Sequence, residues 1–186
     1  MAYKNTEIEL KFSLPNPEDV INFLNINAKK IFDSTVQTDT YYTPAHKNFL
    51  DADYPYQWLR IRESDKGLFL NYKHFYPENK EENDYCDEFE ILVDDPVIKE
   101  IFLRLDFKKI IEVRKERTSW AYKNVEISID TIKELGTFIE FEITTYFDNP
   151  KEAKKYLHKL TREIGLKAGP AIHKGYPLIL LEKNNL

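Results

Sequence analysis

The sequence predicts a mainly β fold of the α+β class, in which one closed or nearly closed antiparallel sheet carries helices on its outer side. Apolar and polar residues alternate with a period of two through most of the chain, which is the pattern of half-buried strands. Helical patterns interrupt the strands only briefly, and each half of the chain runs strand, helix and then a group of strands. A chain of 186 residues has the length of about one domain, which we place at 1–186.

The alternation predicts eight strands. They are expected at roughly residues 5–14, 31–42, 56–64, 67–75, 84–93, 108–119, 121–130 and 136–147.

Helices are expected between these strands at 17–30, 95–105 and 149–166. The first two begin at a proline or an Asp-Pro pair, and the third begins at Asn149-Pro150 and ends near Gly165, so that it has a signal at each end. The tail over 173–183 has the pattern of one or two further helical turns. Loops are expected at 43–55, 77–83 and 167–172.

Composition excludes several classes of protein. The chain has 27 Lys and Arg against 32 Asp and Glu, and a net charge of −5 argues against a broad nucleic-acid or anionic membrane surface. No apolar run approaches the roughly 18 residues of a membrane span, and the start has no signal-peptide pattern, so we expect a cytoplasmic protein. The single cysteine, Cys86, excludes an internal disulfide, and four scattered histidines argue against a His-based zinc site.

Most of the expected strands carry their charges on one face. The pairs are Glu7 and Glu9, Arg60 and Arg62, Glu88 and Glu90, Lys115 and Arg117, Glu126 and Asp130, and Glu140 and Glu142. Each charged face could simply be solvated and carry cross-strand ion pairs. If instead the helices cover the apolar side, the charged side lines the interior of a barrel. Four of the six arginines lie in two short strand segments, which favours the second interpretation, because arginine suits forked oxygen ligands such as phosphate.

Acids and bases gathered in one cavity suit a polyanion that binds together with a cation. The bases would hold phosphates, and the carboxylates would hold Mg²⁺ or Mn²⁺, hard ions that prefer oxygen ligands.

A series of motifs in order along nearly the whole chain resembles the CYTH superfamily, the triphosphate tunnel metalloenzymes. Glu7-Ile8-Glu9-Leu10-Lys11 resembles the family's N-terminal ExExK signature. The further matches are Gln37–Tyr42 with QxDxYF, Leu59–Arg62 with LRxR, Tyr72-Lys73 with a YK strand, Glu88–Glu90 with ExE, Lys115–Arg117 with KxR, Ile129–Glu142 with LDxxxxLGxFxExE, and Lys174–Leu181 with the closing SYxxLL segment. The likeness is strongest to the small members labelled class IV adenylate cyclase.

The resemblance implies an eight-stranded antiparallel β-barrel, a triphosphate tunnel with a charged interior and helices outside. It implies metal-dependent attack on a triphosphate, by cyclisation of ATP or by hydrolysis of thiamine triphosphate or inorganic triphosphate. The chain departs from the pattern in three places. No His-Phe pair precedes Glu7, Lys73 is followed by His74-Phe75 instead of Gly-Pro, and Lys174-Gly175 replaces the usual Ser before Tyr176.

Roles follow for the matching residues. The phosphate-binding set is Lys11, Arg60, Arg62, Lys73, Lys115 and Arg117, and Lys11 is also the candidate catalytic residue because it could position the nucleophile. The metal set is Glu7, Glu9, Asp130, Glu140 and Glu142, although these carboxylates could equally pair with the cations.

Supporting roles are open for Gln37 and Asp39, which could orient a basic side chain, and for Glu88 and Glu90, which could bind metal or orient the arginines. His74 is either a general base or incidental.

The expected function is therefore a class IV cyclase reaction, ATP to cyclic AMP and pyrophosphate, or the hydrolysis of a triphosphate. A non-catalytic sensor of polyphosphate or nucleotide is a further alternative. A lipocalin-like carrier would need an apolar barrel interior, the reverse of the alternation seen here. The expected partner is a small-molecule triphosphate, without nucleic acid or membrane, and the protein is expected to be a monomer or a homodimer.

Overall fold

The computed structural model describes residues 5–185. Its internal contacts divide the chain into two compact units, and each unit is built from two separate stretches of sequence. Unit 1 holds the chain up to Thr35 together with Lys115–His173, and unit 2 holds Val36–Arg114 together with the chain from Lys174 onward.

The described residues contain nine strands in one sheet, which confirms the mainly β prediction. Their order in the sheet is β1-β6-β5-β4-β3-β7-β8-β9-β2, and the strand pairs with a described register are antiparallel. Only Ile8 separates β1 from β2 in the chain, so this order is the connectivity of a sheet that closes on itself. The strands are β1 (Thr6–Glu7), β2 (Glu9–Ser13), β3 (Lys29–Thr43), β4 (Gln57–Ser64), β5 (Gly67–Tyr76), β6 (Tyr85–Val93), β7 (Lys108–Tyr122), β8 (Val125–Ile132) and β9 (Gly136–Ile143).

Nine strands replace the predicted eight because the first strand is divided. The sequence predicts one strand over residues 5–14, whereas β1 and β2 stand on either side of Ile8 and have different neighbours in the sheet, β6 and β9. The alternation continues through Ile8, so the pattern carries no sign of the break. The boundary expected between 119 and 121 is also wrong, because β7 continues to Tyr122 and the turn falls at Lys123, where φ is 54°.

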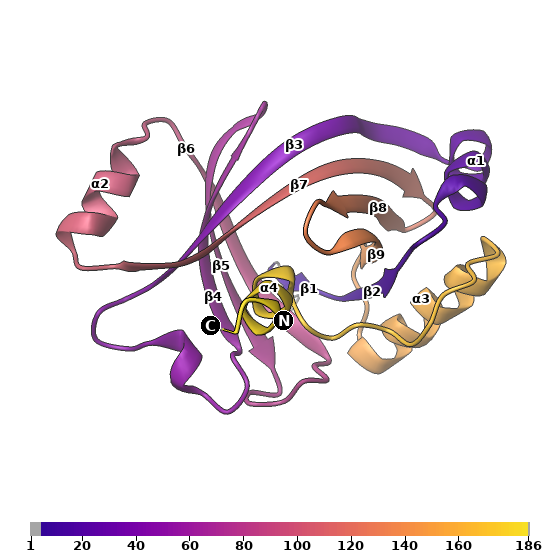
Figure 1. Cartoon of the computed structure of the whole chain (residues 1–186). Helices are drawn as coiled ribbons and strands as arrows, with labels where there is room; N and C mark the ends of the chain where they lie inside the picture. The colour runs from indigo at the N-terminus through magenta and orange to yellow at the C-terminus, as the bar shows by residue number, and fades with distance from the viewer. Residues whose placement is uncertain (1–4, 186) are drawn as a thin grey trace. The chain divides into compact units, whose positions relative to one another are not determined.

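Unit 1 contains the helices α1 (Glu18–Asn27) and α3 (Pro150–Glu163). The first is shorter than predicted because Ala28 is already extended and β3 begins at Lys29. For α3 the predicted end signals are confirmed: Asn149 Oδ1 accepts a hydrogen bond from Lys151 N at 2.9 Å, and Gly165 follows the helix with a φ of 73°. The contacts place α3 against β2 and β9, and Figure 1 shows it running beside β2.

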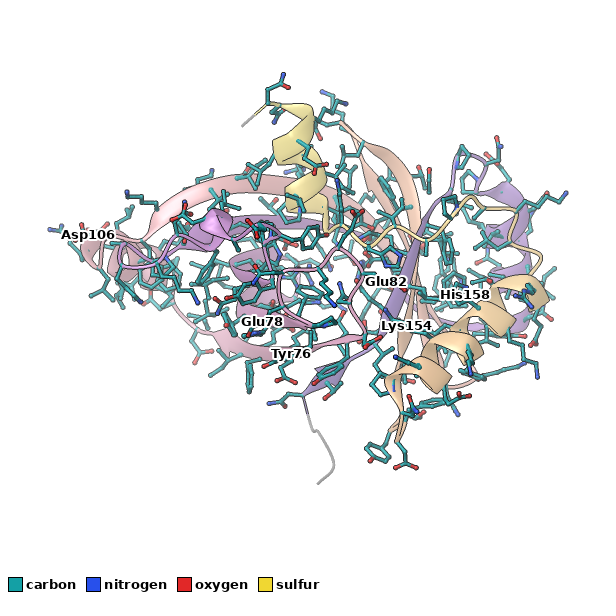
Figure 2. The ribbon with its side chains drawn as sticks, turned by 90° about the horizontal axis from the view of Figure 1, so that it is seen from below. Tyr76, Glu78, Glu82, Asp106, Lys154 and His158 are labelled. Atoms are coloured by element: carbon teal, nitrogen blue, oxygen red, sulfur yellow. The ribbon has the colours of Figure 1, made fainter. Side chains whose placement is uncertain are left out.

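The apolar faces of the unit 1 strands form its core. Phe12 of β2 packs edge-to-face on Phe141 of β9, with ring centroids 6.1 Å apart. On the other side, Phe12 meets His158 of α3, which is labelled with Lys154 in Figure 2. Helix α3 therefore covers the apolar face of β2 and leaves the opposite face to the charged side chains.

Unit 2 contains the helices α2 (Val97–Arg104) and α4 (Tyr176–Lys183) and the short 3₁₀ turn η1 (Phe49–Asp51). Its core is built on Tyr42, Ile61 and Phe102, and Phe102 of α2 packs edge-to-face on Tyr42 at 5.2 Å. The expected helical tail is confirmed as α4. The turn η1 lies inside the segment 43–55 that was expected to be a loop.

No helix among residues 5–185 combines the length and the apolar character that a membrane span requires.

Candidate functional site

In unit 2, strand register brings the predicted charged residues onto one face. Asp39 of β3 lies opposite Arg62 of β4, and Arg60 lies opposite Asn71 of β5. Residues that face each other across an antiparallel ladder point to the same side of the sheet, so these side chains share a face. On β6, Glu90 lies opposite Asn71 and extends the row.

Asp39 is the centre of this group and holds both arginines. Arg62 donates two hydrogen bonds to it, Nε to Oδ1 at 2.6 Å and Nη2 to Oδ2 at 2.7 Å, and Arg60 Nη1 donates to Oδ2 at 3.2 Å. Asp39 is only 2% exposed. Burial alone would lower the pKa of Arg60, but the charge of Asp39 outweighs it and raises that pKa. The contact expected of Asp39, with a basic side chain, is therefore present.

The remaining predicted residues of unit 2 surround Arg60. Glu88 lies 3.8 Å from Arg60 and 3.5 Å from Lys73, and Glu90 lies 3.9 Å from Arg60. Asn71 was not among the predicted residues, yet it is 1% exposed and donates to Glu88 at 2.6 Å and to Glu90 at 3.2 Å. As an uncharged strand residue it gives no sequence signal, but it fixes the two carboxylates beside the arginine.

Among the partners that residues 5–185 offer, two buried polar atoms in this group find none: Arg60 Nε and Gln37 Oε1. A buried donor or acceptor left unpaired costs on the order of 1–3 kcal/mol. Such atoms call for an explanation, and one is a catalytic role or an ion or water that completes the hydrogen bond.

Unit 1 carries a second group of charges, again on one face. Arg117 of β7 lies opposite Asp130 of β8, and Lys11 of β2 lies opposite Glu140 of β9. Asp130 accepts from Lys115 at 2.8 Å and from Arg117 Nε at 2.6 Å. Arg117 also donates to Glu140, and Lys11 lies 3.8 Å from the same carboxylate.

These contacts keep both carboxylates ionised. Burial would raise the pKa of Asp130, but Arg117 and Lys115 outweigh it and hold that pKa well below its usual range. The pKa of Glu140 is lowered to about 2, because Arg117, with Lys115 and Lys11, again outweighs burial. In this structure the two carboxylates are therefore partners of the cations, which is the alternative that the sequence left open.

Other carboxylates of the predicted metal set lie in a row of like charge. Glu9 of β2 is opposite Glu142 of β9, and Glu142 is opposite Glu126 of β8. Glu126 was placed on the charged face but not in the metal set, and only the strand register shows that it belongs to this row. Glu7 lies on β1 and is buried.

Carboxylates directly opposite each other repel, and a divalent cation would relieve that repulsion. The donor chemistry of Glu9 and Glu142 therefore suits Mg²⁺ or Mn²⁺. Within residues 5–185, however, no three or more His, Cys, Asp or Glu side chains are already arranged to hold a metal ion. Metal binding at this face would require side chains to rearrange, and Asp130 and Glu140 would have to exchange a basic partner for the metal.

His74 lies on the other face of β5 from Lys73. Its Nε2 is 2.8 Å from Glu78 Oε1, and its ring stacks on Tyr76 with centroids 4.5 Å apart. Tyr76 and Glu78 are labelled in Figure 2. The structure thus gives His74 neighbours outside the group around Arg60.

The model of the CYTH domain matches residues 5–176, so the chain belongs to the CYTH domain family. A protein of Methanocaldococcus jannaschii whose name proposes adenylate cyclase activity is 26% identical over 172 residues, which cover 91% of this chain and 95% of that protein.

Solved structures share the fold. A protein of Pyrococcus horikoshii matches with a TM-score of 0.77 and 28% identity, over 95% of this chain and 99% of that one. A Hippeastrum protein, whose description proposes adenylyl cyclase activity and reports a dominant triphosphatase activity, matches with a TM-score of 0.59 and 15% identity, over 97% of this chain and 95% of that one.

Proposed function

We propose that the protein is a divalent-metal-dependent enzyme that acts on a triphosphate, and that its reaction is the class IV cyclisation of ATP to cyclic AMP and pyrophosphate. Family membership supports the general class, because CYTH enzymes process triphosphates with a metal. The name of the Methanocaldococcus jannaschii relative supports the cyclase assignment.

The observation that carries the proposal is the pair of buried charge groups. Asp39 with two arginines and Asp130 with Lys115 and Arg117 are each held on a nearly dry strand face. Buried ion pairs contribute little net stability, because desolvation of the charges cancels most of their attraction. Arg60 Nε has no partner at all in its group. Such an arrangement is better explained by a polyanionic ligand than by folding.

The cations have a defined task in this proposal. Arg60, Arg62 and Lys73 in unit 2, and Lys11, Lys115 and Arg117 in unit 1, bind phosphate oxygens and offset the negative charge that builds up on the leaving group. Asp39 keeps the two arginine forks in place before the ligand arrives. A metal bound through Glu9 and Glu142 would neutralise further phosphate charge.

Hydrolysis of a triphosphate is the second candidate. Neither charge group requires an organic part of the ligand, and the His-Phe pair of some cyclases is absent before Glu7. A protein that shares this fold, the one from Hippeastrum, is described as having a dominant triphosphatase activity. The two reactions differ in the phosphorus attacked: the α-phosphorus by a ribose hydroxyl in the cyclase, and the terminal one by water in the hydrolase.

The test is a substrate panel. ATP, inorganic triphosphate and thiamine triphosphate are incubated with the protein and Mg²⁺, then Mn²⁺, and the products are separated by chromatography. Cyclic AMP with pyrophosphate supports the cyclase, and ADP with orthophosphate, or faster turnover of the other two substrates, supports the hydrolase. Tight binding without turnover would favour the sensor. If the protein neither binds nor turns over any of these triphosphates, the proposal is overturned.

A further inference from the structure

Gln37 lies at one end of the charged strand face of unit 2. It is two residues from Asp39 on β3, so both side chains point to the same side of the sheet. Across the ladder Gln37 lies opposite Ser64, and the next residues on this face are Asp39 and Arg62, which lie opposite each other. Gln37 is 9% exposed. Its amide is therefore buried immediately beyond the arginine that Asp39 holds in place.

The amide oxygen of Gln37 lacks a donor. Among residues 5–185, none donates a hydrogen bond to Gln37 Oε1. Orienting a basic side chain, one role that the sequence left open, would use this oxygen as the acceptor. A buried acceptor that folding leaves unpaired costs stability. Such a group in a candidate site calls for a functional explanation.

An ionised triphosphate cannot satisfy this oxygen. Phosphate oxygens without protons only accept hydrogen bonds, and so does an amide oxygen. Arg60 Nε, the other buried atom that finds no partner in the described chain, is a donor that a phosphate oxygen would satisfy. The two atoms thus call for opposite partners, an acceptor beside Arg60 and a donor beside Gln37.

A divalent cation is also a poor partner for Gln37 Oε1. Arg62 carries a positive charge in the neighbouring position, and Asp39 already binds both Arg62 and Arg60. A metal ion bound to the glutamine would therefore be repelled by the arginines. Both candidate reactions supply an uncharged donor instead, because the oxygen nucleophile is the hydroxyl of water or of ribose.

The neighbouring strands leave space beside the amide. Ser64 of β4 in turn lies opposite Gly67 of β5, so small residues follow Gln37 across the sheet. The Ser64 hydroxyl accepts from Lys66 N at 3.2 Å, within the β4–β5 turn. On this side of the ladder, no bulky side chain lies directly opposite the amide.

We propose that Gln37 Oε1 accepts a hydrogen bond from the oxygen nucleophile and holds it in line with the phosphorus that is attacked. The inference rests on the proposed function and adds to it the residue that orients the nucleophile. As the nucleophile's oxygen bonds to phosphorus, the bond from phosphorus to the departing phosphate oxygen breaks, and the proton passes through water to the departing phosphate. An amide oxygen accepts the hydrogen bond without taking the proton.

This role differs from the one expected of Lys11. A protonated lysine has three donors and no acceptor, so it can bind the nucleophile's oxygen but cannot receive its hydrogen bond. Lys11 lies 3.8 Å from Glu140 in unit 1. The two roles are complementary, and each can be tested without the other.

Gln37→Met and Gln37→Leu test the inference, because both remove the acceptor and keep an apolar side chain in its place. Gln57→Met is the matched control. This other glutamine lies opposite His74 on the other face of the sheet, and its amide accepts from Lys47 and donates to Tyr72. Three quantities are measured: the melting temperature without ligand, turnover at saturating triphosphate with Mg²⁺ or Mn²⁺, and the dissociation constant of inorganic triphosphate by calorimetry in EDTA.

We expect the Gln37 variants to be more stable and less active. Their melting temperature should rise by roughly 2–4 °C, because a buried unpaired acceptor is removed. Their turnover should fall at least about tenfold, because the nucleophile loses its orientation, while the dissociation constant stays within twofold of wild type. Gln57→Met should instead lower the melting temperature and leave turnover unchanged. A gain in stability with a loss of turnover is the sign of a functional residue, since losing a structural residue lowers stability.

Other outcomes overturn the inference. A lower melting temperature or a failure to fold in both Gln37 variants would mean that the amide supports the fold, and unchanged turnover would mean that it does not contact the nucleophile. Weaker binding of a substrate whose turnover at saturation is unchanged would place the contact on the bound substrate or its metal. If wild type turns over none of the triphosphates, the proposed function itself fails and the inference falls with it.

Discussion

Glu142 is the residue whose substitution tests the metal proposal most directly. It lies between Glu9 and Glu126 in the row of carboxylates and is only half-buried, so a change there disturbs folding less than a change at Asp130. Glu142 is therefore a useful site for substitution, because it lies in the middle of the carboxylate row and its side chain is partly accessible to solvent.

Replacing Glu142 with Gln keeps the shape of the side chain and removes its charge. Turnover of the preferred triphosphate is expected to fall by about 100-fold or more, the scale of losing one strong transition-state interaction. The Mg²⁺ concentration for half-maximal activity should also rise. Steady-state rates across a metal titration measure the turnover and the half-maximal Mg²⁺ concentration. The control is Asp148→Asn, which removes the charge of an exposed carboxylate. Full activity of Glu142→Gln, or of wild type in EDTA, would refute the metal assignment.

Glu140 links stability to pH. Its pKa in the folded chain is about 2, below the usual value near 4.5, so the unfolded chain takes up this proton first as the pH falls. The stability that Glu140 contributes is complete above about pH 4.5 and is lost as the pH falls towards 2. The difference in unfolding free energy between wild type and Glu140→Gln should therefore be largest at pH 6 and shrink by pH 3. Urea titrations at several pH values measure it, and a difference that stays constant would contradict the ion-pair geometry.

At the scale of elements, backbone conformation decides the ends of helices and strands. Asp106 follows α2 with a φ of 57°, and Phe107 N donates to the Phe102 carbonyl at 2.9 Å, which closes the helix in the manner of a Schellman motif. A residue with a Cβ is strained in the left-handed region, Asn and Asp less so than others, whereas glycine adopts it freely.

Asp106→Gly is therefore expected to stabilise the protein by about 1 kcal/mol relative to Asp106→Ala, since both lose the carboxylate and only alanine keeps the Cβ. Thermal or urea unfolding of the two variants gives the difference. Equal stability of the two would indicate that this residue leaves the left-handed region at little cost. Asp106 is labelled in Figure 2.

The sequence predicts elements well where side chains mark them. Helix α3 is marked by Asn149 and Gly165, and the charged strand faces by two-residue alternation. The sequence does not mark the break at Ile8, because the alternation continues there. It does not mark the turn at Lys123 either, because lysine does not signal a positive φ. In the candidate site, Asn71 and Glu126 were missed because their places depend on which strands become neighbours, which periodicity does not specify.

At the scale of the whole molecule, ligand binding and stability are linked. A triphosphate at about 100 times its dissociation constant should add about 2.7 kcal/mol to the unfolding free energy and raise the melting temperature by roughly 5–10 °C. Arg62→Ala should remove most of this shift, whereas Arg104→Ala, an exposed arginine of α2, should keep it. Thermal melts with and without inorganic triphosphate decide it, and an equal shift in both variants would mean that Arg62 does not contact the ligand.

The interleaving of the two units has a consequence for synthesis on the ribosome. Most of unit 2, Val36–Arg114, is one continuous stretch that can assemble as it emerges. Strand β2 of unit 1 leaves the ribosome early but pairs with β9, so its partner follows on the order of ten seconds later. Until then the apolar side chains of β2 have no cover. The nascent chain is therefore most vulnerable to aggregation at its beginning, and a holdase chaperone would protect it most effectively there.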